Sequence, residues 1–211
     1  MTSQKISLKN IDAIYLLPLL ASSAILINEK QYREILSFLK NIYYNKREIY
    51  EVLLQNYLFA GFPSVLISLK IANEYFHFHN AKSDGEPRRN FRKEGEINCK
   101  KIYGDKYQKL INNIKRFSPD LSAWLVEEGY GKVLSRKGLS LKKRELSIIA
   151  VLTCLKYDEQ LYSHINGAHR LGIKIETIEN VINNIEILDK KHLAKFGLRV
   201  LLKFKKQKDI L

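Results

Sequence analysis

Apolar residues recur at intervals of three and four along most of the chain, which is the spacing of one helical face. No segment alternates apolar and polar residues between hairpin turns, as a half-buried strand would. The pattern therefore predicts an all-α protein, in which Trp124 packs with Leu121 and Leu125 in the core. The predicted helices cover about 12–27, 29–43, 46–59, the segment after Pro63, and most of 118–205.

Composition divides the chain into three regions. Residues 1–79 and 118–211 are helical in pattern, whereas residues 80–117 are rich in Gly, Arg and Lys. Such a stretch is typical of a loop or linker. We therefore expect an exposed basic connector, with some local order, between two helical domains.

The two helical regions share a helix-start pattern, in "NKREIYEVLLQNYLF" and "KIETIENVINNIEIL". Aligning these segments puts Ile49 on Ile178 and places Ile35 opposite His164. Self-similarity of this kind indicates an internal repeat. If the halves are copies, only the second has a polar residue at the buried position.

The apolar segment 13–27 follows Lys5 and Lys9, which is compatible with a signal peptide. It is too short to span a bilayer, and it continues into an amphipathic helix. We therefore expect a buried helix and no membrane association. The two cysteines lie far apart in sequence and form no CxxC motif, which favours a reduced, cytoplasmic protein.

A net charge of +14 and a pI near 9.6 are compatible with nucleic-acid binding. The basic residues are mostly lysines, however, and they are spread along the chain among acidic residues. No helix-turn-helix, zinc-finger or RNA-binding signature is present. Charge alone supports only non-specific contact, so we do not expect a nucleic-acid partner.

His164 lies on the apolar stripe of a predicted helix that ends at Gly172. A buried imidazole needs a hydrogen-bond partner, since leaving it without one costs a few kcal/mol. That partner is either a backbone carbonyl or an acid from another helix, and Glu145 is the candidate acid. The stripe consists of Tyr157, Leu161, His164, Ala168 and Leu171.

Residues 129–182 resemble the carboxymuconolactone decarboxylase family, which includes alkylhydroperoxidase D. The resemblance rests on the Arg-Glu-Leu helix start of "KKRELSIIAVL", the His-containing helix "EQLYSHINGAHRLG", and the Glu/Thr-rich start of the next helix. Residues 47–63 are similar to the end of the same repeat. The resemblance implies two alkylhydroperoxidase-like helical repeats fused in one chain, degenerate in 1–79 and better kept in 118–211. It also implies a homotrimer that forms a pseudo-hexameric ring.

The peroxidase branch of this family uses a Glu, a Cys-x-x-Cys pair and a His. By the resemblance, Glu145 and His164 match the Glu and the His, but the cysteine positions fall on Tyr157 and Gln160. Only a thiolate supplies the reducing nucleophile of that reaction. An alkylhydroperoxidase-like antioxidant activity is therefore disfavoured.

The decarboxylase branch lacks the cysteine pair, and its members resemble one another in placing a His in a pocket between helices. The resemblance implies a cofactor-free lyase or isomerase that acts on a small organic acid or lactone and binds no metal. His164 would transfer the proton, and Glu145 would orient the imidazole of His164. Arg144 or Arg136 would hold a substrate carboxylate. The alternative is a non-catalytic oligomeric binding protein. Hydrogen-bonding wall residues would be Tyr130, Tyr157 and Gln160.

Overall fold

The computed structural model describes residues 8–26, 28–78 and 89–210, and every regular element in these ranges is a helix. The all-α prediction is confirmed. In chain order the elements are α1 (Ala13–Ile25), α2 (Glu29–Asn41), α3 (Lys46–Gln55), α4 (Tyr57–Phe76), α5 (Phe91–Tyr103), η2 (Gly104–Lys106), α6 (Tyr107–Phe117), α7 (Pro119–Trp124), η3 (Leu125–Val133), α8 (Leu141–Leu155), α9 (Asp158–Arg170), α10 (Ile175–Asn183), η4 (Asn184–Leu188) and α11 (Lys191–Gln207).

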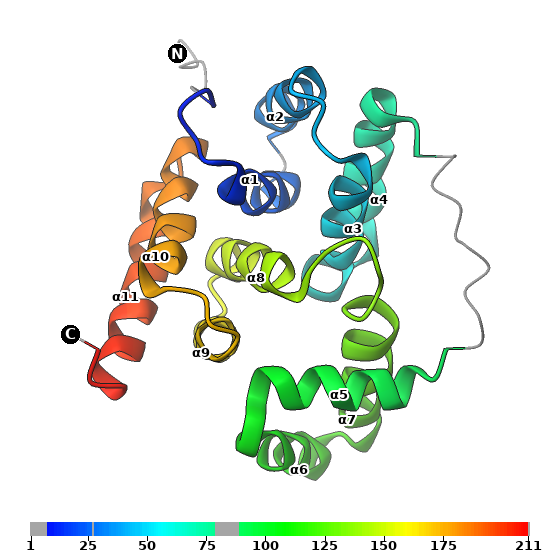
Figure 1. Ribbon diagram of the computed structural model, residues 1–211, viewed down its shortest axis with the longest axis vertical. Coiled ribbons are helices and arrows are strands. Elements are labelled where there is room, and N and C mark those ends of the chain that lie inside the picture. The colour runs from blue at the N-terminus through cyan, green and yellow to red at the C-terminus, as the bar shows by residue number, and fades with distance from the viewer. Residues whose placement is uncertain (1–7, 27, 79–88, 211) are drawn as a thin grey trace.

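Helix α8 is the central element, with α1 and α9 packed on it (Figure 1). It begins behind Ser140, whose hydroxyl accepts a hydrogen bond from the Lys143 amide at 3.3 Å, as a helix cap does. From residue 144 to 154 every side chain is buried, including those of four polar or charged residues. A helix buried on all sides must satisfy its polar groups internally, which brings the partners of these residues together around α8.

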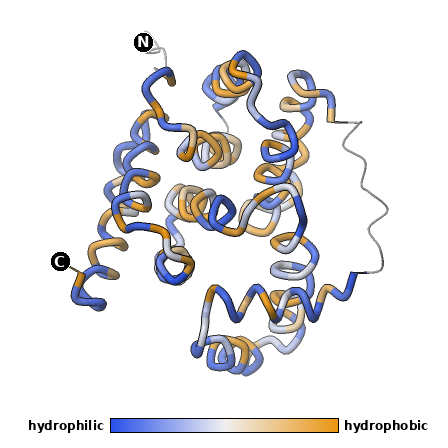
Figure 2. Tube along the Cα trace, in the orientation of Figure 1, coloured by the Kyte–Doolittle hydropathy of each residue, from blue (hydrophilic) through white to orange (hydrophobic). Residues whose placement is uncertain are grey.

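Helix α1 confirms the prediction that the first apolar segment is a buried helix. Leu16, Leu17, Leu19 and Leu20 are each 2% exposed or less, and α1 packs along α8. Hydrophobic residues make up much of α1 in Figure 2. Burial of this apolar surface supplies the main attraction between the first half of the chain and the second.

The expected connector is largely helical, which differs from the sequence interpretation. Helix α5 packs against η3 and α9, and Cys99 and Ile102 on it are fully buried. Charged residues dominate the composition of this stretch, but Gly95, Cys99 and Ile102 follow one another at steps of four and three, as the residues of one helical face do. Residues 79–88, the earlier part of the connector, lie outside the described ranges.

Two glycines let α5 touch η3, a π-helix, backbone to backbone. A Cβ atom on Gly95 would lie 2.0 Å from the Val126 carbonyl oxygen. A Cβ atom on Gly131 would lie equally close, at 2.0 Å, to the carbonyl oxygen of Phe91. Only glycine permits these contacts, so the crossing of the two helices is fixed at these positions.

The helix boundaries agree with the alignment of Ile49 on Ile178. Helices α2 and α9 both have 13 residues and correspond along their whole length in that alignment. In that alignment Ile35 is opposite His164, and both side chains are buried.

The side chains of α7 depart from the expectation. Ser118 caps this helix and Pro119 follows at its first position, and both residue types are typical of a helix start. Trp124 and Leu121, expected in the core, are 59% and 51% exposed. The same helical spacing that buries an apolar face also leaves one exposed when no neighbouring helix covers it.

Within the described ranges, no single helix combines the length and the apolar character needed to cross a membrane. Taken as a pair, α3 and α4 meet those two criteria, but they are bent by 116° relative to each other. Helix α4 contains a further break at Gly61, where φ is 76°.

Candidate functional site

The imidazole of His164 pairs with the carboxylate of Glu145. His164 Nδ1 lies 2.9 Å from Glu145 Oε2, with Glu145 fully buried and His164 6% exposed. Of the two partners that the sequence left open for this ring, the structure shows the acid. Helices α8 and α9 each contribute one member, because both residues face the contact between these two helices.

Gly167 controls the packing around this pair. A Cβ atom there would lie 2.5 Å from Ile102 Cγ2 and 3.3 Å from Glu145 Oε2. The absent side chain therefore lets α5 approach α9 directly beside the carboxylate. In this way α5, which the sequence interpretation treated as part of a connector, forms one wall of the site.

Each member of the pair keeps one polar atom unengaged. A carboxylate only accepts hydrogen bonds, so Nδ1 carries the shared hydrogen and donates it. None of the residues that the structure describes hydrogen-bonds Nε2 of His164. Glu145 Oε1 is buried and likewise has no partner among them. The imidazole also contacts the ring of Phe59 edge to face, with 5.9 Å between the ring centroids, and this contact helps to fix its orientation.

A second polar pair, Tyr103 and Tyr130, lies in the same interior. Their hydroxyl oxygens are 2.6 Å apart, and the rings meet edge to face. Burial raises the pKa of both hydroxyls above the ordinary value, and the negative charge of Glu145 raises each pKa further. Both groups therefore stay protonated and neutral at physiological pH.

Tyr130 was expected as a wall residue, whereas Tyr103 was not anticipated. Tyr103 ends α5, within the stretch whose charge predicted a connector. The spacing of Gly95, Cys99 and Ile102 is the signal in the sequence that could have predicted a helix with one buried face. Tyr103 directly follows Ile102 in that helix. Tyr130 lies in the π-helix η3, a conformation that occurs often at functional sites.

Arg144 lies in a buried ion pair and has no exposed surface. Its guanidinium donates to Glu51 Oε2 at 3.0 Å, to Gln55 Oε1 at 3.1 Å and to the Arg136 carbonyl at 3.0 Å. A side chain held this way cannot reach a ligand. The structure therefore corrects the expectation that Arg144 binds a substrate. Instead, this arginine connects α8 to α3 through its hydrogen bonds to Glu51 and Gln55.

Arg136 also donates to the buried Glu51, from Nε at 3.0 Å and from Nη2 at 3.1 Å. Arg47 forms a third ion pair with the same carboxylate, at 3.0 Å. Burial lowers the pKa of Arg144, and Glu51 opposes that effect. Arg136 is therefore part of the same structural cluster rather than of the Glu145–His164 site.

The two residues at the family's cysteine positions lie at the surface. Tyr157 is half exposed and precedes the first turn of α9, and Gln160 is exposed one turn before His164. Tyr157, which was predicted on the apolar stripe, is 50% exposed because it precedes α9 instead of lying in it. Within one chain, neither side chain contributes a wall to the buried pair.

The cysteines that the chain does contain are unsuited to peroxide chemistry. Burial raises the pKa of the Cys99 thiol and that of the Cys154 thiol to about 12, so both stay protonated. Among the residues described, no cluster of three or more His, Cys, Asp or Glu side chains is arranged to hold a metal ion.

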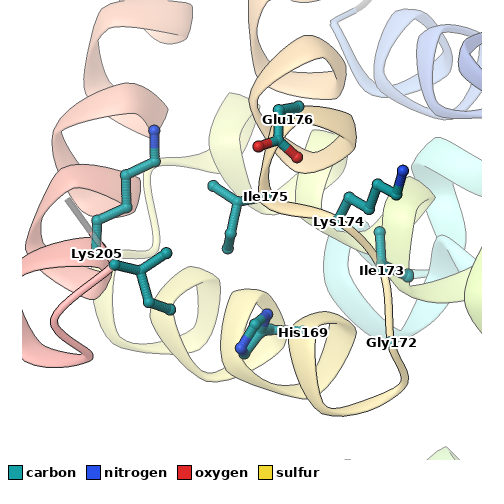
Figure 3. Close-up of a pocket in the computed structure, with 8 residues that line it drawn as sticks. His169, Gly172, Ile173, Lys174, Ile175, Glu176 and Lys205 are labelled. Carbon is teal, nitrogen blue, oxygen red and sulfur yellow. The ribbon is translucent and has the colours of Figure 1, made fainter.

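Two surface clefts lie away from the pair. One has a volume of about 410 Å³ and is lined by His169, Lys174 and Lys205, among others, at the start of α10 (Figure 3). A second cleft of about 510 Å³ lies over α2, beside Arg33 and Tyr75. Neither cleft includes Glu145 or His164, and the imidazole itself is 6% exposed.

Part of the chain is similar to a known protein family. Residues 119–202 match the carboxymuconolactone decarboxylase family, a range that contains both Glu145 and His164. This match confirms the resemblance that the sequence shows in its second half. The chain is also similar to Peroxisomal protein 2 of Schizosaccharomyces pombe, with 28% identity over 143 residues. That similarity covers 63% of this chain and 64% of the relative, which is less than two thirds of its length.

Proposed function

We propose that the chain is a cofactor-free lyase or isomerase that moves a proton on a small organic acid or lactone. The observation that carries this proposal is the buried Glu145–His164 pair, in which a carboxylate fixes the tautomer of an imidazole and leaves Nε2 without a partner in the described structure. This is the arrangement of a general acid or base oriented by a carboxylate. A ring nitrogen without a protein partner is available to exchange a proton with a bound molecule.

The pair is suited to either reaction class. In an isomerisation, Nε2 removes a proton from carbon and returns it to another carbon. In a decarboxylation, the bond between carbon and the carboxyl group breaks, carbon dioxide leaves, and the bonding electrons form an enolate. Protonated His164 then gives its Nε2 proton to carbon and regains one from water. Oriented proton transfer of this kind contributes about 10²–10⁴-fold to a rate.

Two other functions have less support. An alkylhydroperoxidase-like activity needs a reactive thiolate, and both thiols here are buried and protonated. A non-catalytic binding protein would explain the fold but not the buried acid–imidazole pair. Neither the family match nor the name of the relative specifies a reaction, so the choice between these functions depends on the site.

Proton exchange tests the proposal without a known substrate. A panel of small lactones and oxo acids is incubated with the protein in D₂O, and NMR follows deuterium entering carbon–hydrogen positions. We expect exchange into at least one compound and a fall of about 100-fold or more in the His164→Gln variant. His169→Gln, on the same helix but lining the surface cleft, is the matched control and should exchange like the parent. Equal exchange rates for the parent and His164→Gln would contradict the proposal.

We also propose that the chain is built from two repeats and assembles as a homotrimer with pseudo-sixfold packing. The equal lengths and register of α2 and α9 support the repeat. The exposed apolar side chains of α4 and α7 support the assembly. A cytoplasmic location remains a prediction from the reduced cysteines, and the name of the Schizosaccharomyces pombe relative makes the peroxisome the alternative to test.

A further inference from the structure

Helix α4 begins with a single turn, residues 57–60, that is set off from the helices on both sides. It follows α3 after a bend of 116°, and the backbone leaves the helical conformation again at Gly61, where φ is 76°. One helical turn closes few hydrogen bonds of its own and is not stable alone. Contacts with other elements must therefore fix the position of this turn.

Two side chains anchor the turn to other helices. Asn56, the residue before it, is fully buried, and its side-chain amide donates to the Ala21 carbonyl on α1 at 3.0 Å. The Tyr57 hydroxyl donates to Glu128 on η3 at 2.6 Å. The backbone carbonyl of Asn56 also accepts a hydrogen bond from the Phe59 amide at 3.0 Å. The backbone at Phe59 is therefore held by contacts with elements from both halves of the chain.

Phe59 is the residue of this turn that contacts the candidate site. Its ring centroid lies 5.9 Å from that of the His164 imidazole, and the two ring planes meet at 82°. The phenyl ring is partly buried and packs against apolar core residues of both halves. A residue outside the range 119–202 that matches the family thus contacts the candidate proton-transfer group.

The hydrogen bond to Glu145 does not fix the imidazole by itself. A histidine ring turns about two side-chain torsions, and the second of them has broad preferences. The bond at Nδ1, which is 2.9 Å long, restrains that atom but restrains the plane of the ring, and so the direction of Nε2, much less. Because an edge-to-face contact favours one angle between two rings, Phe59 supplies the second restraint.

We propose that Phe59 is a positioning residue, which holds the His164 ring with Nδ1 on Glu145 and Nε2 in one direction for proton transfer. The inference rests on the proposed function, because it gives Phe59 a role in that reaction. This role is exerted through His164, since a phenyl ring exchanges no proton. Moving a reacting group by about 1 Å costs about 100-fold in rate. The first half of the chain therefore contributes to the reaction as well as to stability.

Leucine at position 59 separates an orienting ring from apolar filling. Phe59→Leu keeps an apolar side chain but removes the flat ring, so we expect proton exchange in D₂O to slow about tenfold. Phe59→Tyr retains the ring and should exchange like the parent. Phe76→Leu is the matched control, because Phe76 lies on the same helix, is also partly buried and contacts another ring, that of Phe78. It should likewise exchange like the parent.

A second measurement reports on the imidazole itself and needs no substrate. The ¹⁵N NMR signals of the His164 ring, assigned with His164→Gln, distinguish the nitrogen that carries hydrogen from the one that does not. In the parent we expect the hydrogen on Nδ1. In Phe59→Leu the two ¹⁵N shifts should move toward each other, because a ring that turns away from Glu145 exchanges between tautomers. Phe59→Tyr and Phe76→Leu should retain the parent shifts, and Phe59→Met replaces Phe59→Leu if the leucine variant does not fold.

Unchanged ¹⁵N shifts in Phe59→Leu would overturn the inference, and so would an exchange rate equal to that of Phe76→Leu. Equal behaviour of Phe59→Tyr and Phe59→Leu would also overturn it, since the ring would then serve only to fill space. If the shifts respond to Phe59→Leu in a protein that exchanges no protons, Phe59 orients the imidazole and the proposed function is rejected. Proton exchange that His164→Gln abolishes and Phe59→Leu leaves intact would retain the proposed function and reject the role of Phe59.

Discussion

At the scale of single residues, Glu51 pairs with three arginines. It is fully buried and accepts from Arg47, Arg136 and Arg144. Glu51→Gln would leave three guanidinium groups around a neutral amide, with Arg144 deep in the core. Breaking a buried ion pair on one side costs about 3–5 kcal/mol. We expect a loss of that size in the free energy of unfolding, measured by urea denaturation.

Glu48→Gln is the control for this change. Glu48 lies one turn earlier on α3 and pairs with Lys143 at 2.6 Å, but both side chains keep contact with water. Pairs of this kind contribute about 1 kcal/mol or less. Equal losses of unfolding free energy in the two glutamine variants would show that the buried ion pairs of Glu51 do not contribute more to stability than the exposed pair of Glu48.

The buried thiols give a pH-dependent prediction. The pKa values of Cys99 and Cys154 rise from 9.0 to about 12 on burial, so the folded state favours the protonated thiols. This contribution to stability is fully present below pH 9 and is lost as the pH rises toward 12. The Cys99→Ala/Cys154→Ala variant should therefore lose less of its unfolding free energy than the parent over that interval.

A thiol reagent tests the same environment directly. At pH 8 we expect no reaction of the native protein with dithionitrobenzoate, and complete reaction of both thiols in guanidinium chloride. Rapid labelling of the native protein would show an accessible thiolate and would reopen the peroxidase alternative.

The residues of the site differ in how far the sequence predicts them. Helical spacing places His164 on a buried face, and burial of an imidazole requires a partner, so the Glu145 pairing follows from local pattern and resemblance. The position of Arg144 does not follow, because its partner Glu51 lies in a different region of the chain. Burial of an arginine depends on that distant carboxylate, and no local pattern reports it.

At the scale of elements, the crossing of α5 and η3 depends on a pair of glycines. Gly131→Ala would place a methyl group 2.0 Å from the Phe91 carbonyl oxygen, and a backbone atom cannot move aside as a side chain does. We expect the two helices to separate, with a loss of about 3 kcal/mol in unfolding free energy. The same displacement would move Tyr130 away from Tyr103 and break the hydrogen bond between their hydroxyls.

Gly129→Ala is a close control for that change. Gly129 lies in the same π-helix, but a Cβ atom there would meet nothing within 4 Å. Replacing a helical glycine by alanine at an open position stabilises by up to about 1 kcal/mol. Equal melting temperatures for the two alanine variants would show that the close helix approach is not required.

This crossing also shows why the connector was misinterpreted. Most residues of α5 lie outside its buried face, and they account for its charged composition. The face that packs against other helices is a narrow stripe of small and apolar residues. Glycine in a helix usually weakens it, so Gly95 counts against a helix in a sequence interpretation. The compensating contact with Val126 becomes visible only when η3 is in place.

At the scale of the whole molecule, burial and ion pairing join the two halves. Helix α1 packs along α8, and Glu51 on α3 binds arginines on or before α8. The site itself combines α8 and α9 with α5, the element between the halves. A fragment limited to residues 118–211 would retain Glu145 and His164 but lose Tyr103, Ile102 and the packing that buries them.

The surface of the single chain retains an apolar area that a larger assembly would cover. Phe62 and Leu66 on α4 are each 65% exposed, and Phe62 stacks on Tyr57. The Tyr57 hydroxyl donates to Glu128 at 2.6 Å, which joins this part of α4 to η3, directly after Trp124. Large exposed aromatic residues near one another are typical of protein–protein interfaces.

The proposed homotrimer is therefore tested at these positions. Light scattering coupled to gel filtration should give three times the chain mass of 24.6 kDa for the parent protein. Trp124→Glu and Phe62→Glu should shift the mass toward that of one chain, because a carboxylate buried at an apolar interface is strongly unfavourable. Tyr43→Glu, at a residue 94% exposed in the turn after α2, should leave the mass unchanged. A parent protein with the mass of one chain would rule out the trimer, and a trimer insensitive to both substitutions would place its interface elsewhere.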